Sequence, residues 1–291
     1  MIDIKLLEQL CLCNGISGDE GNVRNLIINE IKDCADDIKT DNLGNLIVFK
    51  KGKKSAKSKL MVSAHMDEVG LMVTDITSDG YLKFDEVGGI DRRVLPGKRV
   101  CVGRNGLNGV IGVKPIHLTN GDEKTAVPKM NDMYIDIGAE SREDALKYVN
   151  YGDGINFEGD FKINGKTVVT KALDDRFGCY VLINLIKSEP EYDMYFTFVV
   201  QEEVGLRGAR SAAFTVNPDF ALVIESTTAA DVAEVDVSHQ VCNLSKGATV
   251  TVMDRATVYD KEMISAAFEL AEKNNIAVQY KRACLLYTYP S

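Results

Sequence analysis

The sequence contains no tryptophan, only three histidines in 291 residues, and no apolar run close to the roughly 20 residues that a membrane-spanning helix needs. The lack of such a run argues against a membrane protein. The lack of tryptophan argues against a groove that stacks sugar rings on indoles. The first residues also lack a basic stretch followed by an apolar one, so we expect no signal peptide.

Charge and cysteine usage exclude further classes. The 34 basic and 43 acidic residues give a formal net charge of −9, which argues against nucleic acid or an anionic membrane as a partner. The seven cysteines are odd in number and scattered, and Cys11 and Cys13 form C-x-C rather than the C-x-x-C of many zinc sites. We therefore expect reduced thiols in a cytoplasmic protein.

The apolar pattern predicts an α/β fold with a mixed, mostly parallel sheet flanked by helices. Ser17, with Glu20 three residues later, has the spacing of a capping box and predicts a helix start. A further helix is predicted after Asp175, with its buried face formed by Phe177, Val181, Leu182, Leu185 and Ile186.

Residues 70–165 differ in composition from the rest of the chain. They hold most of the chain's 24 glycines and short runs of alternating apolar and polar residues joined by Asn-Gly turns. This pattern predicts a small all-β domain inserted into an α/β domain made of residues 1–69 and 166–291. At 291 residues the chain is long enough for two such domains.

Three apolar runs each end in ionisable side chains. "KLMVSAHMD" ends at His65 and Asp67, "TFVVQEE" at Glu202 and Glu203, and "FALVIES" at Glu225. In open α/β sheets, ligands bind beyond the carboxyl ends of the strands. If these runs are neighbouring strands, one histidine and four acids meet at one edge of the sheet.

Asp174 and Asp175, at the start of the predicted helix, add two more acids to this group. Each residue also has an ordinary explanation: a core histidine, a simple His–Asp ion pair, acids at a helix N-terminus, or solvated glutamates at strand ends. The coincidence of four segments favours a shared site. So many carboxylates cannot all ionise together unless cations lie among them.

A pair of divalent metal ions, Zn²⁺ or Co²⁺, is the simplest way to neutralise these carboxylates, since both ions accept imidazole nitrogen and carboxylate oxygen as ligands. Metal-bound water becomes a usable nucleophile near neutral pH, and a carboxylate that is not a ligand is needed to take its proton. One glutamate of the adjacent pair Glu202–Glu203 can bind metal while the other serves as the base.

The segments "AHMDEVGLMV", "KALDDRFGC", "QEEVGLRGA" and "VIESTTAAD" together resemble the tetrahedral (TET) family of dinuclear metallo-aminopeptidases, some members of which are labelled cellulase or endoglucanase. The resemblance runs from the first helix to about Arg282. It implies a cytoplasmic, metal-dependent enzyme that removes N-terminal residues from short peptides. It also implies that the inserted β domain mediates dimerisation and that dimers assemble into dodecamers.

The resemblance implies a role for each site residue. His65, Asp174, Glu203 and Glu225 are metal ligands, with Asp174 bridging the two ions. Glu202 is then the general base, and Asp67 orients His65.

The resemblance to the family does not extend to the C-terminus of the sequence. The family has a Gly-Gly-x-Asp-Ala-Gly stretch and a last metal-binding histidine after the position of Ala283, whereas this chain continues with "CLLYTYPS". We expect residues 284–291 to be non-native, because residues 284–288 match one reading frame of a common sequencing adapter; a natural short terminus is the alternative. His117 and His239 are the remaining histidines, and neither is expected to replace the missing one. The chain as written is therefore expected to bind metal weakly and to be impaired.

Three other functions stay open. A glycoside hydrolase of the endoglucanase type would need two carboxylates and no metal, and would leave His65 without a role. A non-catalytic assembly subunit is compatible with the missing ligand. A deacetylase or acyl-amino-acid hydrolase on a related fold is the third.

Overall fold

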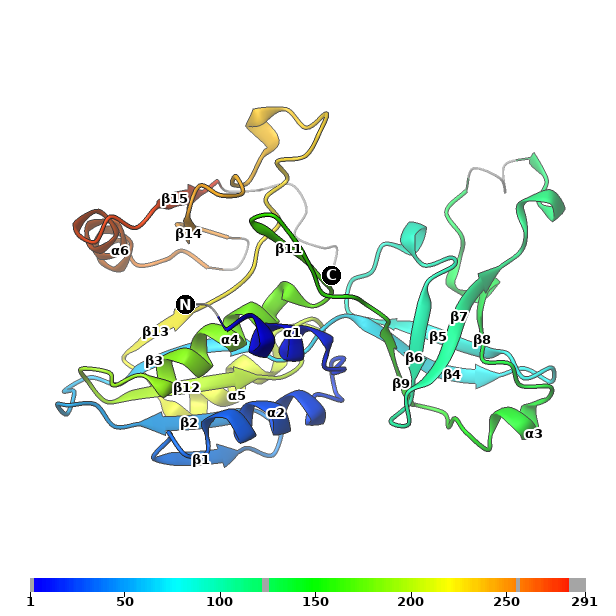
Figure 1. The fold of residues 1–291 in the computed structure, drawn as a ribbon, viewed down its shortest axis with the longest axis horizontal. Helices are drawn as coiled ribbons and strands as arrows, with labels where there is room; N and C mark the ends of the chain where they lie inside the picture. The colour runs from blue at the N-terminus through cyan, green and yellow to red at the C-terminus, as the bar shows by residue number, and fades with distance from the viewer. Residues whose placement is uncertain (1–2, 122–125, 255–256, 283–291) are drawn as a thin grey trace. The chain divides into compact units, whose positions relative to one another are not determined.

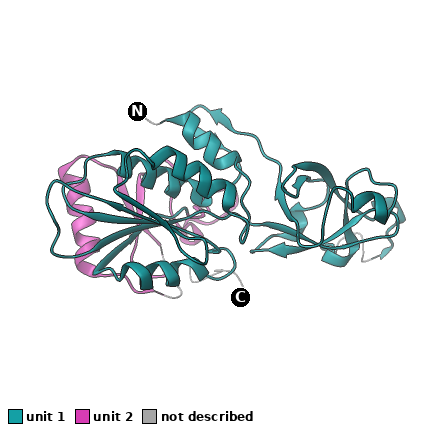
Figure 2. Ribbon diagram, turned by 90° about the horizontal axis from the view of Figure 1, so that it is seen from below, with its two compact units in different colours: residues 1–226 teal, residues 227–291 magenta. Residues whose placement is uncertain are grey.

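The computed structural model describes residues 3–121, 126–254 and 257–282, and the expectation for residues 284–291 lies outside them. The chain divides into two compact units, residues 1–226 and residues 227–291 (Figure 2). This division does not test the predicted inserted domain, whose boundaries at 69/70 and 165/166 stay a prediction.

The first unit contains a five-stranded mixed sheet (Figure 1). Its strands, in spatial order, are β1 Asp37–Thr40, β2 Leu46–Lys50, β12 Met194–Val199, β3 Leu60–His65 and β13 Phe220–Val223. Strands β12 and β13 pair with β3 in parallel, whereas β1–β2 and β2–β12 are antiparallel. The mixed α/β class is confirmed, but parallel pairing does not predominate among the described strands of this sheet.

Successive side chains of a strand face opposite sides, and helices cover both sides of this sheet (Figures 1 and 2). Val48 and Val62 pack in one cluster with helices α1 Ile4–Leu12, α2 Gly21–Ile31 and α4 Leu173–Lys187. Ile47 and Met61 pack in another cluster with α5 Arg207–Val216. Apolar packing thus covers the two faces of the sheet, and the carboxyl ends of its strands are left for polar groups.

Two sequence predictions about helices are wrong. Helix α2 begins at Gly21 rather than directly after Ser17, and Glu20 occupies the N-cap position without a side-chain cap bond. In α4 the buried stripe includes Cys179 and Ile183, while Phe177 and Leu185 are exposed. Apolar residues cover more than one stripe of this helix, so only packing against the sheet decides which stripe is buried.

Between β3 and α4 the chain forms a closed six-stranded barrel. Around the barrel the strands are β4 Gly70–Ile76, β5 Leu82–Val87, β8 Met133–Asp136, β7 Leu107–Val113, β6 Arg99–Val102 and β9 Gly154–Phe157. Buried apolar residues of its strands pack in one cluster, and the short helix α3 Arg142–Ala145 lies between β8 and β9 in the chain. The two-stranded hairpin of β10 Lys162–Asn164 and β11 Thr167–Val169 then leads back to α4.

The second unit contains a pair of parallel strands, β14 Ala248–Thr251 and β15 Val278–Lys281, connected through helix α6 Lys261–Lys273. Asp260 caps α6 by accepting a hydrogen bond from the Met263 amide. Among the described residues, no helix is long and apolar enough to cross a membrane.

Candidate metal centre

The predicted site residues meet at one edge of the five-stranded sheet. His65 is the last residue of β3 and lies opposite Val199, the last residue of the parallel strand β12. Glu202 and Glu203 follow β12, and Glu225 follows β13 on the other side of β3. Because all three strands run in the same direction, their carboxyl ends bring these side chains together.

The imidazole of His65 is buried and faces different carboxylates with its two nitrogens. Nδ1 lies 3.4 Å from Asp67 Oδ1 and 3.1 Å from the Asp67 carbonyl. Nε2 lies 3.2 Å from Asp174 Oδ1 and 3.5 Å from Glu225 Oε1. With a metal ion bound, a proton on Nδ1 would be held by Asp67, and the Nε2 lone pair would be free to bind the ion.

His65 belongs to two groups of side chains that are close enough to share a metal ion. One group is His65, Asp174 and Glu225, and the other is His65, Glu202 and Glu203; within each, the candidate ligand atoms lie within 4.8 Å of one another. One imidazole nitrogen with several carboxylate oxygens is a donor set that suits Zn²⁺ and related divalent ions. The residues present therefore fit a metal centre.

The pKa values of the acids reflect their burial first and the charges of their neighbours second. Burial raises the pKa of Glu203 to about 7, and the neighbouring Asp174 and Glu202 carboxylates act in the same direction. Burial likewise raises the pKa of Glu202 and of Glu225. Burial opposes ionisation of Asp174 as well, but its hydrogen bonds to His65 and Glu225 and the charge of His65 together outweigh that effect and lower its pKa. A bound cation would favour the ionised form of all four acids.

Asp67 is fully buried and serves as an acceptor for several donors. Its Oδ1 accepts a hydrogen bond from the Glu202 amide at 3.0 Å, and its Oδ2 accepts one from the Glu203 amide at 3.1 Å. Burial opposes the ionisation of Asp67, but the hydrogen bonds from His65, Ser17 and the Glu202 amide lower its pKa. Asp67 thus connects the end of β3 to the turn that carries both glutamates.

Asp175 is a site residue to which the sequence analysis gave no separate role. It is fully buried, and its carboxylate accepts hydrogen bonds from the His65 and Gly178 amides. Burial raises its pKa to about 9, and the Glu225 carboxylate adds to this. The peptide bond between Asp174 and Asp175 is cis. The Asp-Asp pair in the sequence was a signal for the segment, but it did not distinguish the two acids.

The other two histidines lie elsewhere. His117 is in a short 3-10 helix, Ile116–Leu118, in the chain between β7 and β8, and it joins no metal-competent group within the described ranges. His239 is in the 3-10 helix Val237–His239 of the second unit. The last metal-binding histidine of the family has no counterpart in the sequence after Ala283, and this part of the chain lies outside the described residues.

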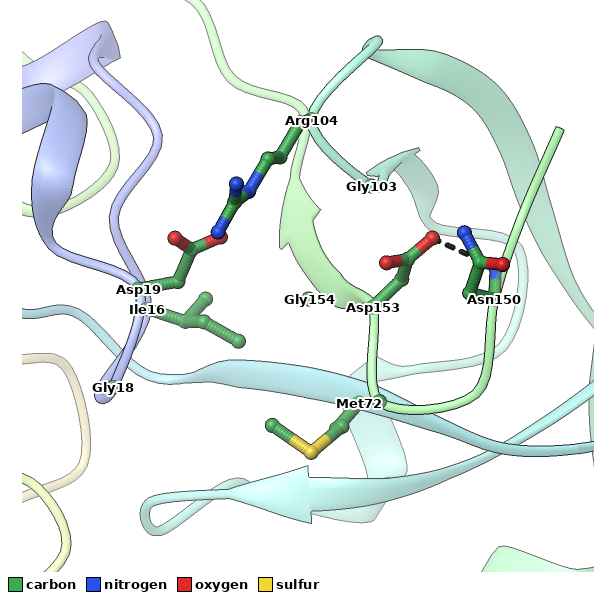
Figure 3. A pocket seen from close by; sticks show the side chains of 10 residues that line it. Ile16, Gly18, Asp19, Met72, Gly103, Arg104, Asn150, Asp153 and Gly154 are labelled. Atoms are coloured by element: carbon green, nitrogen blue, oxygen red, sulfur yellow. Dashed lines mark hydrogen bonds between the residues drawn. The ribbon is translucent and has the colours of Figure 1, made fainter.

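A separate cavity of about 370 Å³ lies beside the segment that precedes α2 (Figure 3). The Asp19 and Arg104 side chains point toward one another across it, and Asp153 accepts a hydrogen bond from the Asn150 amide at 2.8 Å. The candidate site residues do not line this cavity: His65, Asp67, Asp174, Glu202, Glu203 and Glu225. The candidate metal centre is therefore a convergence of side chains at the sheet edge rather than the floor of this cavity.

Comparison with known proteins identifies the family. The M42 glutamyl aminopeptidase profile matches residues 44–288. A relative from Acetivibrio thermocellus is 44% identical over 276 residues, which cover 94% of this chain and 80% of the relative.

Two solved structures have the same fold. A TET aminopeptidase from a marine sediment archaeon of the Thaumarchaeota is 33% identical, with a TM-score of 0.90 over 96% of this chain and 80% of that one. The TET1 peptidase of Pyrococcus horikoshii, described as assembling into a tetrahedron or a large octahedral shell, is 41% identical, with a TM-score of 0.84 over 96% and 83% of the two chains. With its acid-rich sheet edge, its profile match and these relatives, the chain belongs to the M42 glutamyl aminopeptidase family.

Proposed function

We propose that this chain is a metal-dependent aminopeptidase that removes N-terminal residues from short peptides. The observation that carries the proposal is the convergence of His65 with Asp174, Glu225, Glu202 and Glu203 at the carboxyl ends of adjacent strands. The family and the names of its solved relatives support the same reaction.

Two divalent ions, Zn²⁺ or Co²⁺, are proposed as the cofactor. His65 and Glu225 would bind one ion, Glu203 the other, and Asp174 would bridge the two. The group of His65, Asp174 and Glu225 supports the first of these assignments, and Glu203 belongs to the second group, with His65 and Glu202. When bound, such ions polarise a carbonyl oxygen and make water a nucleophile near neutral pH.

Glu202 is proposed as the general base. Its raised pKa suits a carboxylate that accepts a proton and then donates it to the departing amine. Asp67 would keep the His65 ring in one orientation and, through the Glu202 and Glu203 amides, fix the backbone that carries base and ligand. In this assignment the adjacent glutamates have different tasks.

We further propose that residues 70–165 form the inserted β domain and that it mediates self-association toward a dodecamer, with the catalytic domain made of residues 1–69 and 166–291. Among the described residues of this segment, five large aliphatic side chains are more than half exposed, which supports an interface there: Val94, Ile116, Leu118, Val127 and Ile163. The shells described for the Pyrococcus horikoshii relative give the precedent.

The competing functions fit the site less well. In a metal-free glycoside hydrolase, a buried histidine hydrogen-bonded to acids on both nitrogens would have no task. A non-catalytic subunit would keep the barrel but show no turnover at any metal concentration.

The test is hydrolysis of a panel of aminoacyl-anilides by the purified chain, first stripped of metal and then given Zn²⁺ or Co²⁺. We expect metal-dependent release of the N-terminal residue, abolished by Glu202→Gln, which keeps the size of the side chain but removes the base. Activity that survives complete chelation would refute the metal mechanism. Metal binding without turnover, with turnover gained on appending a family-like C-terminal segment, would identify an impaired chain.

A further inference from the structure

The turn Ile16–Glu20 is built differently from the helix cap that its sequence resembles. Ser17 and Glu20 are each 5% exposed, while Gly18 and Asp19 between them are exposed. The turn is attached to the chain segment leaving β3, because the Ser17 amide donates to the Glu68 carbonyl at 3.3 Å. Two buried polar side chains thus point inward from a surface turn, and each needs a partner.

The partner of Ser17 is Asp67. Ser17 Oγ donates to Asp67 Oδ2 at 2.5 Å, on the same oxygen that accepts from the Glu203 amide. The other oxygen accepts from the Glu202 amide. A carboxylate held by donors on both oxygens cannot rotate freely, so the Ser17 hydroxyl helps to fix the plane in which Asp67 presents its oxygens to both amides.

The partner of Glu20 is the backbone just before the two glutamates. Glu20 Oε1 accepts hydrogen bonds from the Gly18 amide at 2.7 Å and from the Gln201 amide at 3.2 Å. Gln201 has a φ of 54°, a left-handed conformation that is unfavourable for a residue with a side chain. The hydrogen bond that the Gln201 amide donates to Glu20 stabilises this conformation, which directs the chain from β12 into Glu202.

We propose that Ser17 and Glu20 are positioning residues of the candidate metal centre. Ser17 acts through Asp67, Glu20 acts through Gln201, and together they set the directions in which Glu202 and Glu203 project. The proposal rests on the proposed function for what the two glutamates hold, but the positioning itself is a property of the metal-free chain and is measured there.

The first experiment is amide hydrogen exchange of the metal-free chain. In Ser17→Ala, the amides of Glu202 and Glu203 should exchange at least about fivefold faster, because Asp67 loses a donor that holds it in place. In Glu20→Ala the Gln201 amide should show the same increase, and Glu20→Gln, which keeps a carbonyl acceptor, should restore most of the protection. If Ser17→Ala fails to fold, Ser17→Cys fills the same space with a weak donor and takes its place.

Two matched controls separate positioning from general damage. Asp19→Asn changes the same turn, but at a side chain directed into the neighbouring cavity toward Arg104 (Figure 3). Ser211→Ala removes a hydrogen bond of the same kind, from Ser211 Oγ to Asp41 Oδ2 at 2.8 Å. Neither control should change exchange at Glu202 or Glu203; equal changes in Ser17→Ala and in either control would overturn the proposal.

The second experiment titrates the full chain with Co²⁺ and follows its visible absorption bands. Ser17→Ala should weaken Co²⁺ binding about 10- to 100-fold and shift the bands, as loss of outer hydrogen-bond partners does at metal sites, and Ser17→Thr should restore both. Unchanged exchange and unchanged Co²⁺ binding in Ser17→Ala would refute the positioning role. Faster exchange in a chain that binds no Co²⁺ even when unsubstituted would instead confirm the positioning and refute the metal function.

Discussion

Arg176 offers the most demanding test of how the site is anchored. It is fully buried one residue after the Asp174–Asp175 pair, and its side-chain hydrogen bonds go to residues other than the candidate metal ligands. Its guanidinium donates to the carbonyls of four residues and to one carboxylate: Met66 at 2.8 Å, Leu10 at 2.6 Å, Cys13 at 2.7 Å, Gly15 at 3.3 Å and Glu68 at 3.5 Å. The side chain therefore joins α4 to the end of α1 and to the segment leaving β3.

Arg176→Met removes the charge and leaves these buried acceptors without their donor. Hydrogen bonds to charged groups contribute about 1.5–3 kcal/mol each but are not additive. The Met variant also avoids the free-energy cost of burying a cation, which offsets part of the loss. Breaking one side of a buried charged network costs about 3–5 kcal/mol in comparable cases. We expect a loss of that size in the free energy of unfolding. Arg176→Lys keeps the charge but not the planar fork, so its loss should be smaller.

The assay is urea unfolding followed by circular dichroism, with Lys187→Met as the matched control. Lys187 pairs with Glu30 at 2.6 Å on the surface, where such a pair contributes about 0–1 kcal/mol. An Arg176→Met midpoint equal to that of Lys187→Met would refute the reasoning, because it would mean that the five contacts of Arg176 contribute nothing beyond a surface pair.

Three further predictions address the core, close packing and the metal. Phe198→Ala, at a fully buried position of β12, should lower the free energy of unfolding in urea by about 3–5 kcal/mol. Phe214→Ala, at a position that is 88% exposed, should change it by no more than about 0.5 kcal/mol, and equal losses would contradict the described core. Gly208→Ala should destabilise by about 1–3 kcal/mol, because its Cβ would lie 2.3 Å from Asn45 Oδ1. Gly21→Ala should not destabilise, because its Cβ would make only an ordinary contact, 3.8 Å from Arg24 Nη2; the midpoints of the two variants decide this. Zn²⁺ at about 100 times its Kd should stabilise the chain by about 2.7 kcal/mol, and an unchanged melting temperature would argue against a specific site.

Much of the candidate site follows from the sequence because strand ends are locally encoded. The apolar runs that stop at His65 and at Glu202 are largely buried strands, β3 and β12. The run before Glu225 was expected to be buried as well, and this expectation is wrong, because all four residues of β13 are exposed. The sequence left open whether these three strands are neighbours, and the structure shows that they are, since β3 lies between β12 and β13. The direction of the β2–β12 pairing was not encoded in this way, because an apolar run has the same pattern in parallel and antiparallel sheets.

The Ser17–Glu20 turn shows the limit of local patterns. The spacing of a capping box matched, but both side chains found partners far along the chain, at Asp67 and at Gln201. A hydroxyl or carboxylate forms whichever hydrogen bond the fold brings within reach, and the sequence ranks only the nearby candidates.

The sequence by itself determined the α/β class, the strand ends and the residue types of a metal centre, because hydrophobic periodicity and side-chain chemistry act over a few residues. The tertiary structure decided which stripe of α4 is buried, which acids face each nitrogen of His65, and that Ser17 contacts Asp67 rather than a helix end. These outcomes depend on packing between segments distant in sequence, and no local pattern contains the distances involved.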